Sequence, residues 1–247
     1  MFIFELLQQV RRSFLGGRRR WRERRVYKQT GGTVVSGLFR GMKLIRIPGQ
    51  LRLAHKLLGT YEMELVPFLQ EIIKNDYDVI INLGAGDGYY AVGLLRRMPT
   101  VRVVAFENSE VRRNLILDNA RRNCVEDRLV VCGNTRNHDI NEYYQSADRL
   151  LVVCDIEGHE KEVLGGSCIA NISQADILVE VHDFVDPDVS SVLRERFSVS
   201  HRIETVYSRE RTFDDLPGQS GRQISALLEI VGEERPTTME WFWLKSK

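Results

Sequence analysis

The amino-acid sequence predicts an α/β protein whose sheet is mostly parallel and covered by helices on both faces. Two observations indicate this class. Short runs rich in Val, Ile and Leu alternate with helical patterns from residue 61 onward, and a glycine-rich loop joins the first of these runs to a helix. With 247 residues, of which 43% are hydrophobic and 28% charged, the chain can bury a core, which argues against disorder of the whole chain.

The apolar runs have the length expected of strands that are buried on both faces of a parallel sheet. They fall at residues 78–83, 102–107, 128–132, 150–155 and 177–181, and two later strands are predicted at 201–207 and 241–245. The predicted helices cover residues 61–74, 89–97, 110–123, 140–146, 160–170 and 223–231.

Composition divides the chain into three regions. Residues 1–32 form a basic N-terminal extension, and residues 61–247 form the main domain. Between them, residues 33–60 are a lead-in segment in which 33–35 and 42–47 are expected to be short strands or simply extended chain. Between Arg11 and Lys28 there are nine Lys or Arg residues and a single acid, Glu23, although the whole chain has a net charge of only +1. Such a local run can act as an interaction arm even in a nearly neutral protein.

Three interpretations of this arginine run stay open. It can be a solvated, partly disordered arm, or a peripheral membrane contact in which apolar residues precede a basic cluster. Nucleic-acid binding is disfavoured, since only Trp21 and Tyr27 interleave with the arginines.

The sequence also bears on where the protein works. No apolar stretch reaches the roughly 18 residues of a membrane span, and the basic cluster follows the apolar segment instead of preceding it as in a signal peptide. We therefore expect a cytoplasmic protein, with peripheral contact at the inner face of the membrane if the basic extension binds lipid.

The glycine loop is the strongest functional signal. The strand at 78–83 runs directly into Gly84-Ala85-Gly86-Asp87-Gly88, and Tyr89 opens a helix. Glycines allow close approach of a ligand and left-handed backbone conformations. Glu107 ends the next strand, 23 residues after Gly84, where an acid accepts hydrogen bonds from the ribose of an adenosine group.

The loop favours an adenosine ligand without phosphates. Tyr89 occupies the position at which a dinucleotide fingerprint has its third glycine, and no G-K-[S/T] of a P-loop follows. S-adenosylmethionine fits better, because its sulfonium and amino acid end need carbonyls and carboxylates instead of a phosphate cradle.

From about residue 35 to 247 the sequence resembles class I S-adenosylmethionine-dependent methyltransferases, and more specifically the FkbM-like family. The stretch that resembles D-x-E-G-x-E is the most specific, and the lead-in 57–65 resembles relatives found among polysaccharide-biosynthesis proteins. The four segments that carry the resemblance are Asn82-Leu83-Gly84-Ala85-Gly86-Asp87-Gly88-Tyr89-Tyr90, Phe106-Glu107-Asn108, Cys154-Asp155-Ile156-Glu157-Gly158-His159-Glu160 and Val179-Glu180-Val181-His182-Asp183.

This resemblance implies a Rossmann-like, seven-stranded sheet with the last strand antiparallel, and O-methylation, often of a sugar or polyketide hydroxyl. Two positions depart from the usual pattern. Asn82 stands where many methyltransferases have an acid for the methionine amino group, although its amide oxygen can still accept, and His159 stands where the family often has Ala or Tyr. The implied cofactor-binding residues are Asn82, Gly84, Ala85, Gly86, Gly88, Tyr89, Glu107, Asn108, Asn134 and Asp155.

A hydroxyl acceptor must lose its proton as it attacks, so the site needs a base or a metal. We predict that His182, just after the fifth strand, is the base, because imidazole titrates near neutral pH. Asp155 and Glu157 are predicted to shape the acceptor side; they face opposite ways if the strand continues and the same pocket if the chain turns at Gly158. A site for Mg²⁺ or a similar hard ion among these acids, Glu180, His182 and Asp183 is a less favoured alternative, and we predict no metal.

Other functions stay open alongside O-methylation of a sugar, polysaccharide or related small molecule. The chain could methylate protein or nucleic acid, or serve as a non-catalytic cofactor-binding scaffold subunit of a glycan-assembly complex. An NAD-dependent oxidoreductase is a third possibility, against which Tyr89 argues.

Overall fold

The computed structural model describes residues 17, 19–48, 50, 53–133, 143, 149–165, 172–218, 230–233 and 235–247. The chain forms two compact units. Unit 1 comprises Met1–Met63 and Glu210–Glu234, and unit 2 comprises Glu64–Arg209 and Arg235–Lys247. The predicted boundaries at residues 32 and 60 stay a prediction.

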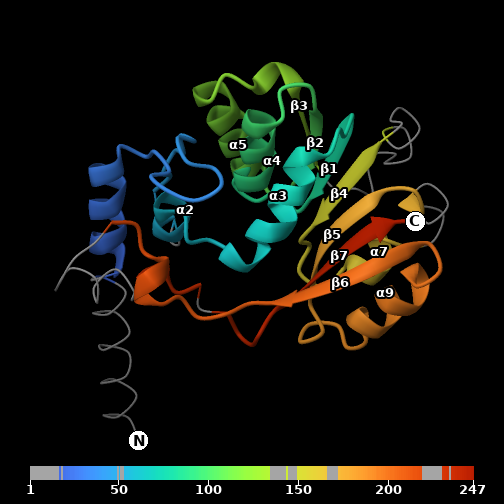
Figure 1. Ribbon diagram of the computed structural model, residues 1–247. Coiled ribbons are helices and arrows are strands. Elements are labelled where there is room, and N and C mark those ends of the chain that lie inside the picture. The colour runs from blue at the N-terminus through green and yellow to red at the C-terminus, as the bar shows by residue number, and fades with distance from the viewer. Residues whose placement is uncertain are drawn as a thin grey trace, which may run out of the picture. The chain divides into compact units, whose positions relative to one another are not determined.

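Unit 2 contains a seven-stranded sheet in the order β3-β2-β1-β4-β5-β7-β6. Strands β1 to β5 are parallel, and β7 runs antiparallel to both β5 and β6. This confirms the expected mostly parallel sheet with its last strand antiparallel (Figure 1). The strands are β1 (Val79–Leu83), β2 (Arg102–Phe106), β3 (Leu129–Cys132), β4 (Leu150–Cys154), β5 (Asp176–Val181), β6 (His201–Tyr207) and β7 (Glu240–Ser246).

Helices cover both faces of this sheet, with α3, α4 and α5 on one side and α7 and α9 on the other (Figure 1). Apolar side chains of β1, β4 and β5 form a buried cluster with Leu164, Leu193 and Phe197 on the α7–α9 side. The helices and 3-10 turns of the unit are α3 (Val66–Lys74), α4 (Tyr89–Arg97), α5 (Glu110–Arg122), α7 (Glu160–Val163), α9 (Val189–Phe197), η1 (Met63–Leu65, whose first residue belongs to unit 1) and η2 (Glu126–Arg128).

The predicted helices differ from the observed ones in three places. Residues 61–65 form turns and η1 ahead of α3, α7 ends at Val163 and is followed by a turn at 164–165 where the predicted helix continued, and α9 was not predicted at all. The predicted helix 140–146 lies outside the described residues except for Tyr143, and so does most of the predicted helix 223–231.

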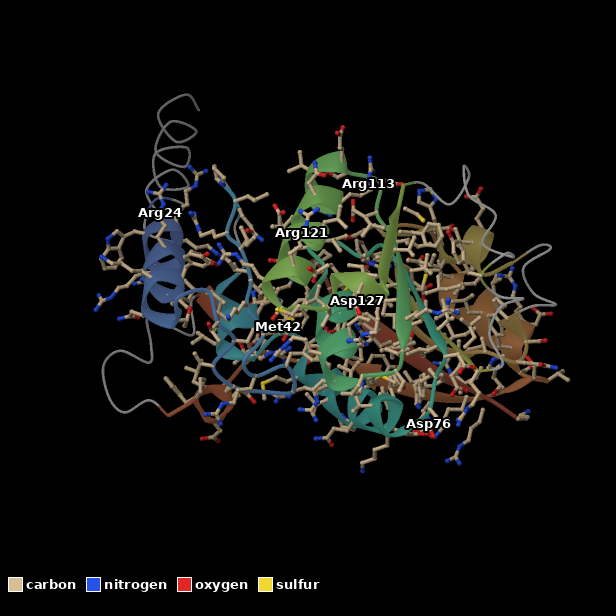
Figure 2. All side chains as sticks on the ribbon, turned by 90° about the horizontal axis from the view of Figure 1, so that it is seen from above. Arg24, Met42, Asp76, Arg113, Arg121 and Asp127 are labelled. Atoms are coloured by element: carbon tan, nitrogen blue, oxygen red, sulfur yellow. The ribbon has the colours of Figure 1, made fainter. Side chains whose placement is uncertain are left out.

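In unit 1, residues 19–30 are helical and lead into α2 (Ala54–Leu58) through the lead-in segment. The Glu23 carboxylate, buried on this helix, accepts from the backbone N–H groups of Leu53 and Ala54 and so holds the start of α2. Arg24 projects from the helix into solvent, whereas Met42 is buried in the same unit (Figure 2). A solvated, disordered arm is therefore the wrong interpretation of residues 19–30.

Of the two arrangements predicted for 33–35 and 42–47, short strands are absent from these described residues, which have only the isolated antiparallel bridge Thr33–Lys43. Arg211 and Glu233, from the later stretch of this unit, contact its first stretch through their side chains. Arg211 donates to the Thr60 carbonyl at 2.7 Å and forms an ion pair with Glu233, which also accepts from the Glu62 N–H. Within the described parts of the chain, no helix combines the length and apolarity that crossing a bilayer requires.

Candidate active site at the carboxyl ends of β1, β2, β4 and β5

The sheet order places a topological switch point at β1. The chain passes from β1 outward to β2 and β3, and then returns to the other side of β1 with β4 and β5. In open α/β sheets, ligands bind in the crevice outside the carboxyl ends of the strands at such a point. The glycine loop follows β1, Glu107 follows β2, Asp155 follows β4 and His182 follows β5.

The three glycines of the loop all have φ in the left-handed region, at +75° for Gly84, +59° for Gly86 and +81° for Gly88. A Cβ on Gly84 would lie 1.7 Å from the Asp155 carbonyl oxygen, and one on Gly88 would lie 3.2 Å from Ile116. A Cβ on Gly86 would meet nothing within 4 Å. Gly84 and Gly88 therefore permit close packing of the chain, and Gly86 faces open space.

Glu107 fixes the shape of this loop. Its side chain is only 8% exposed, and one carboxylate oxygen accepts from the Gly86 N–H at 2.9 Å while the other accepts from the Ser109 N–H at 2.8 Å. Arg113 of α5 (Figure 2) donates to the main-chain carbonyls of Glu107 and of the exposed Asn108. The acid and the glycine loop that the sequence links are therefore in direct contact.

Asn82, in β1, is 2% exposed and donates through Nδ2 to the Val153 carbonyl at 3.3 Å. Its Oδ1 is buried without a hydrogen-bond partner among the described residues. A buried acceptor without a donor is costly, and a ligand amino group would satisfy it. The other predicted cofactor residues of this loop, Ala85 and Tyr89, are buried beside it, whereas Asn134 lies outside the described residues.

The segment after β4 brings two predicted acids to one place. The chain turns there, with φ of +57° at Glu157 and +105° at Gly158, so that Asp155 and Glu157 both reach His182. The distance from His182 Nε2 is 3.7 Å to Asp155 Oδ1 and 3.6 Å to Glu157 Oε2. Of the two arrangements that the sequence allowed, the structure has the one in which both acids share a site.

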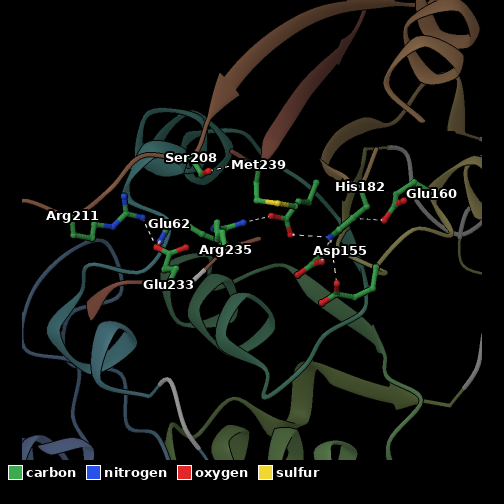
Figure 3. Close-up of polar contacts among 11 residues, drawn as sticks. Glu62, Asp155, Glu160, His182, Ser208, Arg211, Glu233, Arg235 and Met239 are labelled. Carbon is green, nitrogen blue, oxygen red and sulfur yellow. Dashed lines mark hydrogen bonds and ion pairs between the residues drawn. The ribbon is translucent and has the colours of Figure 1, made fainter. Parts of the chain in front are cut away.

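Glu160 holds the other nitrogen of the imidazole. It is fully buried at the start of α7, and its Oε1 lies 2.8 Å from His182 Nδ1 and accepts from the Gly158 N–H (Figure 3). Burial would lower the pKa of His182, but the hydrogen bond to Glu160 and the nearby acids raise it above its ordinary value. For the acid Glu160 burial acts in the other direction and would raise the pKa, but the hydrogen bond from His182 keeps that pKa below its ordinary value.

Glu180, in β5, completes the surroundings of His182. Its Oε2 lies 3.6 Å from His182 Nε2, and its other oxygen is paired with Arg235. The pKa of Asp155 is raised by burial, against the opposing effect of His182. Three carboxylate groups therefore face one imidazole nitrogen.

Two residues near this cluster point elsewhere. His159 is 68% exposed and lies 3.6 Å from Glu162, and the carboxylate of Asp183 accepts from the Ser190 N–H of α9. The sequence analysis did not assign Glu160 or Arg235 to the site. Glu160 had a signal, because it is the last acid of the D-x-E-G-x-E stretch; Arg235 had none.

No model of a protein family matches the chain, and no curated protein sequence does. Similar solved structures include a precorrin-6y C5,15-methyltransferase from Geobacter metallireducens, with 12% identity over 76% of this chain and 90% of that one and a TM-score of 0.48. An S-adenosylmethionine-dependent O-methyltransferase from Thermotoga maritima has 16% identity over 72% and 63%, with a TM-score of 0.46. A tRNA methyltransferase from B. subtilis has 10% identity over 73% and 64%, with a TM-score of 0.46.

These neighbours all carry the name of methyltransferases, and none points to the FkbM-like family. At such identities and TM-scores the similarity does not bear on the substrate or activity of this chain, and the FkbM-like assignment stays a prediction.

Proposed function

We propose that this chain is an S-adenosylmethionine-dependent methyltransferase that methylates a hydroxyl of a sugar, polysaccharide or related small molecule. The observation that carries the proposal is the contact between Glu107 and Gly86 at the switch point of the sheet. This contact brings a buried acid to the glycine loop, beside open space, in the crevice where such a sheet binds its ligand.

The residues present fit this cofactor. Each oxygen of Glu107 accepts one backbone N–H and keeps a further lone pair for a ribose hydroxyl. The unpartnered Asn82 Oδ1 suits the amino group of the methionine end. Gly86 leaves room for the adenosine, and the loop holds no lysine for phosphates.

When bound, S-adenosylmethionine supplies an electrophilic methyl group and a neutral thioether as the leaving group. The chain must hold the acceptor hydroxyl in line with that methyl group and receive its proton. We place this work at the ends of β4 and β5, where His182, Asp155 and Glu157 lie together. A glycan or small-molecule acceptor is favoured by the resemblance of the sequence to FkbM-like proteins, and protein, nucleic acid or a non-catalytic scaffold role are the alternatives.

The cofactor is tested with the full chain by calorimetry against S-adenosylmethionine, S-adenosylhomocysteine and NAD. We expect the first two to bind and NAD not to bind. Glu107→Ala should weaken S-adenosylhomocysteine binding by about 1.5–3 kcal/mol, the range for hydrogen bonds to charged groups. Glu110→Ala, which removes an exposed acid three residues away, is the matched control and should leave the affinity unchanged.

Unchanged affinity in a folded Glu107→Ala protein would contradict the assignment of the ribose contact. Binding of NAD in preference to S-adenosylhomocysteine would contradict the proposed function as a whole.

A further inference from the structure

We infer that Asp155, Glu157 and His182 form a binding site for one divalent cation of the Mg²⁺ or Mn²⁺ class. One potential ligand atom from each residue lies within 4.8 Å of the other two. The set combines two carboxylates, which hard cations prefer, with one imidazole nitrogen. The use of the cation in catalysis rests on the proposed function, whereas its binding does not.

The first support is the direction of the imidazole. His182 is 98% buried, and its Nδ1 is engaged by Glu160, so Nε2 is the nitrogen that faces the carboxylates. Nε2 has no hydrogen bond among the described residues, because each facing oxygen lies 3.6–3.7 Å away. A histidine that ligates a metal almost always gives its second N–H to a carboxylate or carbonyl, as His182 does to Glu160.

The second support is an independent orphan atom. Asp155 Oδ1 is buried and has no hydrogen-bond partner among the described residues, and it is the oxygen that faces His182 Nε2. A buried acceptor without a donor is costly. A cation between the two atoms would satisfy both of them at once.

The third support is charge. The carboxylates of Asp155, Glu157, Glu160 and Glu180 surround one imidazole. Arg235 forms an ion pair with Glu180 and also acts on Asp155, so its one charge is shared between these two acids. A divalent cation would balance the acids that face Nε2.

The spacing is close to that of a coordination shell. Octahedral bonds of roughly 2.1–2.5 Å place neighbouring ligand atoms roughly 3.0–3.5 Å apart. The distances of 3.6 and 3.7 Å from His182 Nε2 therefore need to contract by only a few tenths of an ångström, and the two carboxylate oxygens lie within 4.8 Å of each other. Glu157 is 80% exposed, so the outer positions of the cation are open to water or to an acceptor hydroxyl.

This site changes the role predicted for His182. With a cation bound, Nε2 is a ligand and does not take the hydroxyl proton. The cation lowers the pKa of a bound hydroxyl, whose proton then passes to water. His182 is in this arrangement a ligand held by Glu160 instead of a general base.

The test is a Mn²⁺ titration of the full chain without cofactor. Binding is measured by calorimetry and by the electron paramagnetic resonance signal of free Mn²⁺. We expect one Mn²⁺ per chain, displaced by Mg²⁺. Glu157→Gln, at an exposed position that should not disturb folding, and Asp155→Asn should each weaken binding about tenfold or more. Glu160→Gln, which alters the residue that positions His182, should weaken it about 10–100-fold.

His159→Gln and Glu162→Gln are the matched controls, because both residues are exposed on the same segment and outside the cluster. Unchanged Mn²⁺ affinity in these controls supports the site. Absence of Mn²⁺ binding, or equal losses in the controls and in Glu157→Gln, would overturn it. S-adenosylhomocysteine binding is measured on the same samples, so that loss of the cation site and failure of the proposed function are separate results.

Discussion

Gly86 differs from the other two glycines of its loop in what its missing side chain would touch. Gly84 and Gly88 make room for Asp155 and Ile116, whereas Gly86 faces open space while its N–H donates to Glu107. A side chain at this position would project into the space that the cofactor needs. The glycine is therefore required by the ligand and by the backbone, not by the packing of the chain.

Gly86→Val should abolish S-adenosylhomocysteine binding in calorimetry. The substitution also strains the backbone, because a β-branched residue is a poor fit at φ of +59°. Gly31→Val is a matched control, since Gly31 has the same φ of +59° and its Cβ would also meet nothing within 4 Å.

Both variants should lose a similar amount of stability, about 1–3 kcal/mol, and only Gly86→Val should lose the ligand. If Gly86→Val binds as tightly as the Gly31→Val protein, the cofactor does not occupy the space beside Gly86.

At this scale the sequence predicts the residues that stand at strand ends, because apolar runs stop abruptly at a polar residue. Asp155, Glu157 and His182 were placed together on that ground, and the structure brings them together. Glu160 was missed, since an acid in the first turn of a helix is common for reasons of the helix dipole alone. Its partner is 22 residues away, and only the turn at Gly158 brings the two side chains together.

At the scale of single elements, the helix at 19–30 has two distinct sides. Val26 and Glu23 are buried in unit 1, and the opposite side is exposed. At about 100° per residue the exposed basic residues and Trp21 fall within roughly 140° of arc. This basic face consists of Arg20, Trp21, Arg24, Arg25 and Lys28.

The basic face should bind anionic membranes. Its cations suit acidic lipid headgroups, and Trp21, which is 60% exposed, suits the interfacial region. The triple substitution Arg20→Gln, Arg24→Gln and Lys28→Gln should weaken binding to phosphatidylserine vesicles by roughly 3 kcal/mol, at about 1 kcal/mol per charge. Vesicle sedimentation at fixed ionic strength measures the effect.

The control is the triple Lys74→Gln, Arg121→Gln and Arg122→Gln, which removes the same charge from exposed positions of α3 and α5. Equal losses in both triples, or binding of RNA in place of vesicles, would contradict a membrane role for the basic face. Point substitutions are preferable to removal of residues 1–30, since Glu23 holds the start of α2.

Elements were predictable where a sheet imposes its own pattern. Each strand of unit 2 was placed to within one residue at either end. In β1 and β4 the reason is that burial on both faces requires a continuous apolar run. The structure of the lead-in segment was not predictable in this way. Val34, Met42 and Leu44 are buried around turns and a single bridge, so their apolar pattern resembles that of short strands. Helix α9 escaped prediction because it follows a stretch rich in Asp and Pro and is short, with few apolar residues.

At the scale of the whole molecule, a buried histidine connects segments of unit 2 that are far apart in the sequence. His201 opens β6 and donates through Nε2 to the Ala175 carbonyl just before β5, while Nδ1 accepts from the Ser200 hydroxyl. The Phe197 ring of α9 lies edge-on at 5.0 Å. The charged groups nearby are Asp176 and Lys247.

Burial lowers the pKa of His201 below its ordinary value, so the folded state binds a proton less readily than the unfolded chain. Above a pH of about 6.5 neither state is protonated and the folded state has its full stability. As the pH falls below about 6.5, the unfolded chain takes up the proton first, and the free energy of unfolding decreases. His201 should therefore contribute a loss of stability in urea between pH 7 and pH 5, whereas His182, whose pKa is raised in the folded state, contributes in the opposite direction.

His201→Gln should be about 1 kcal/mol less stable than the wild type at pH 7, because it disturbs a buried hydrogen bond. Between pH 7 and pH 5 its free energy of unfolding should decrease less than that of the wild type. His159→Gln, at an exposed histidine, should keep the wild-type slope. A His201→Gln protein with the wild-type pH dependence would show that another group controls it.

The Asp155 carbonyl oxygen occupies the space that a Cβ on Gly84 would need, since the two atoms would lie 1.7 Å apart, and this has a consequence for how the crevice can move. Asp155 also donates its N–H to the Leu83 carbonyl at 3.0 Å, so the last residue of β1 and the first residue after β4 are joined directly. In the proposed function, the wall for the adenosine and the wall for the acceptor are therefore tied together by a backbone hydrogen bond. Any residue other than glycine at position 84 would displace the acid of the second wall, so a change made beside the first ligand would be felt at the second.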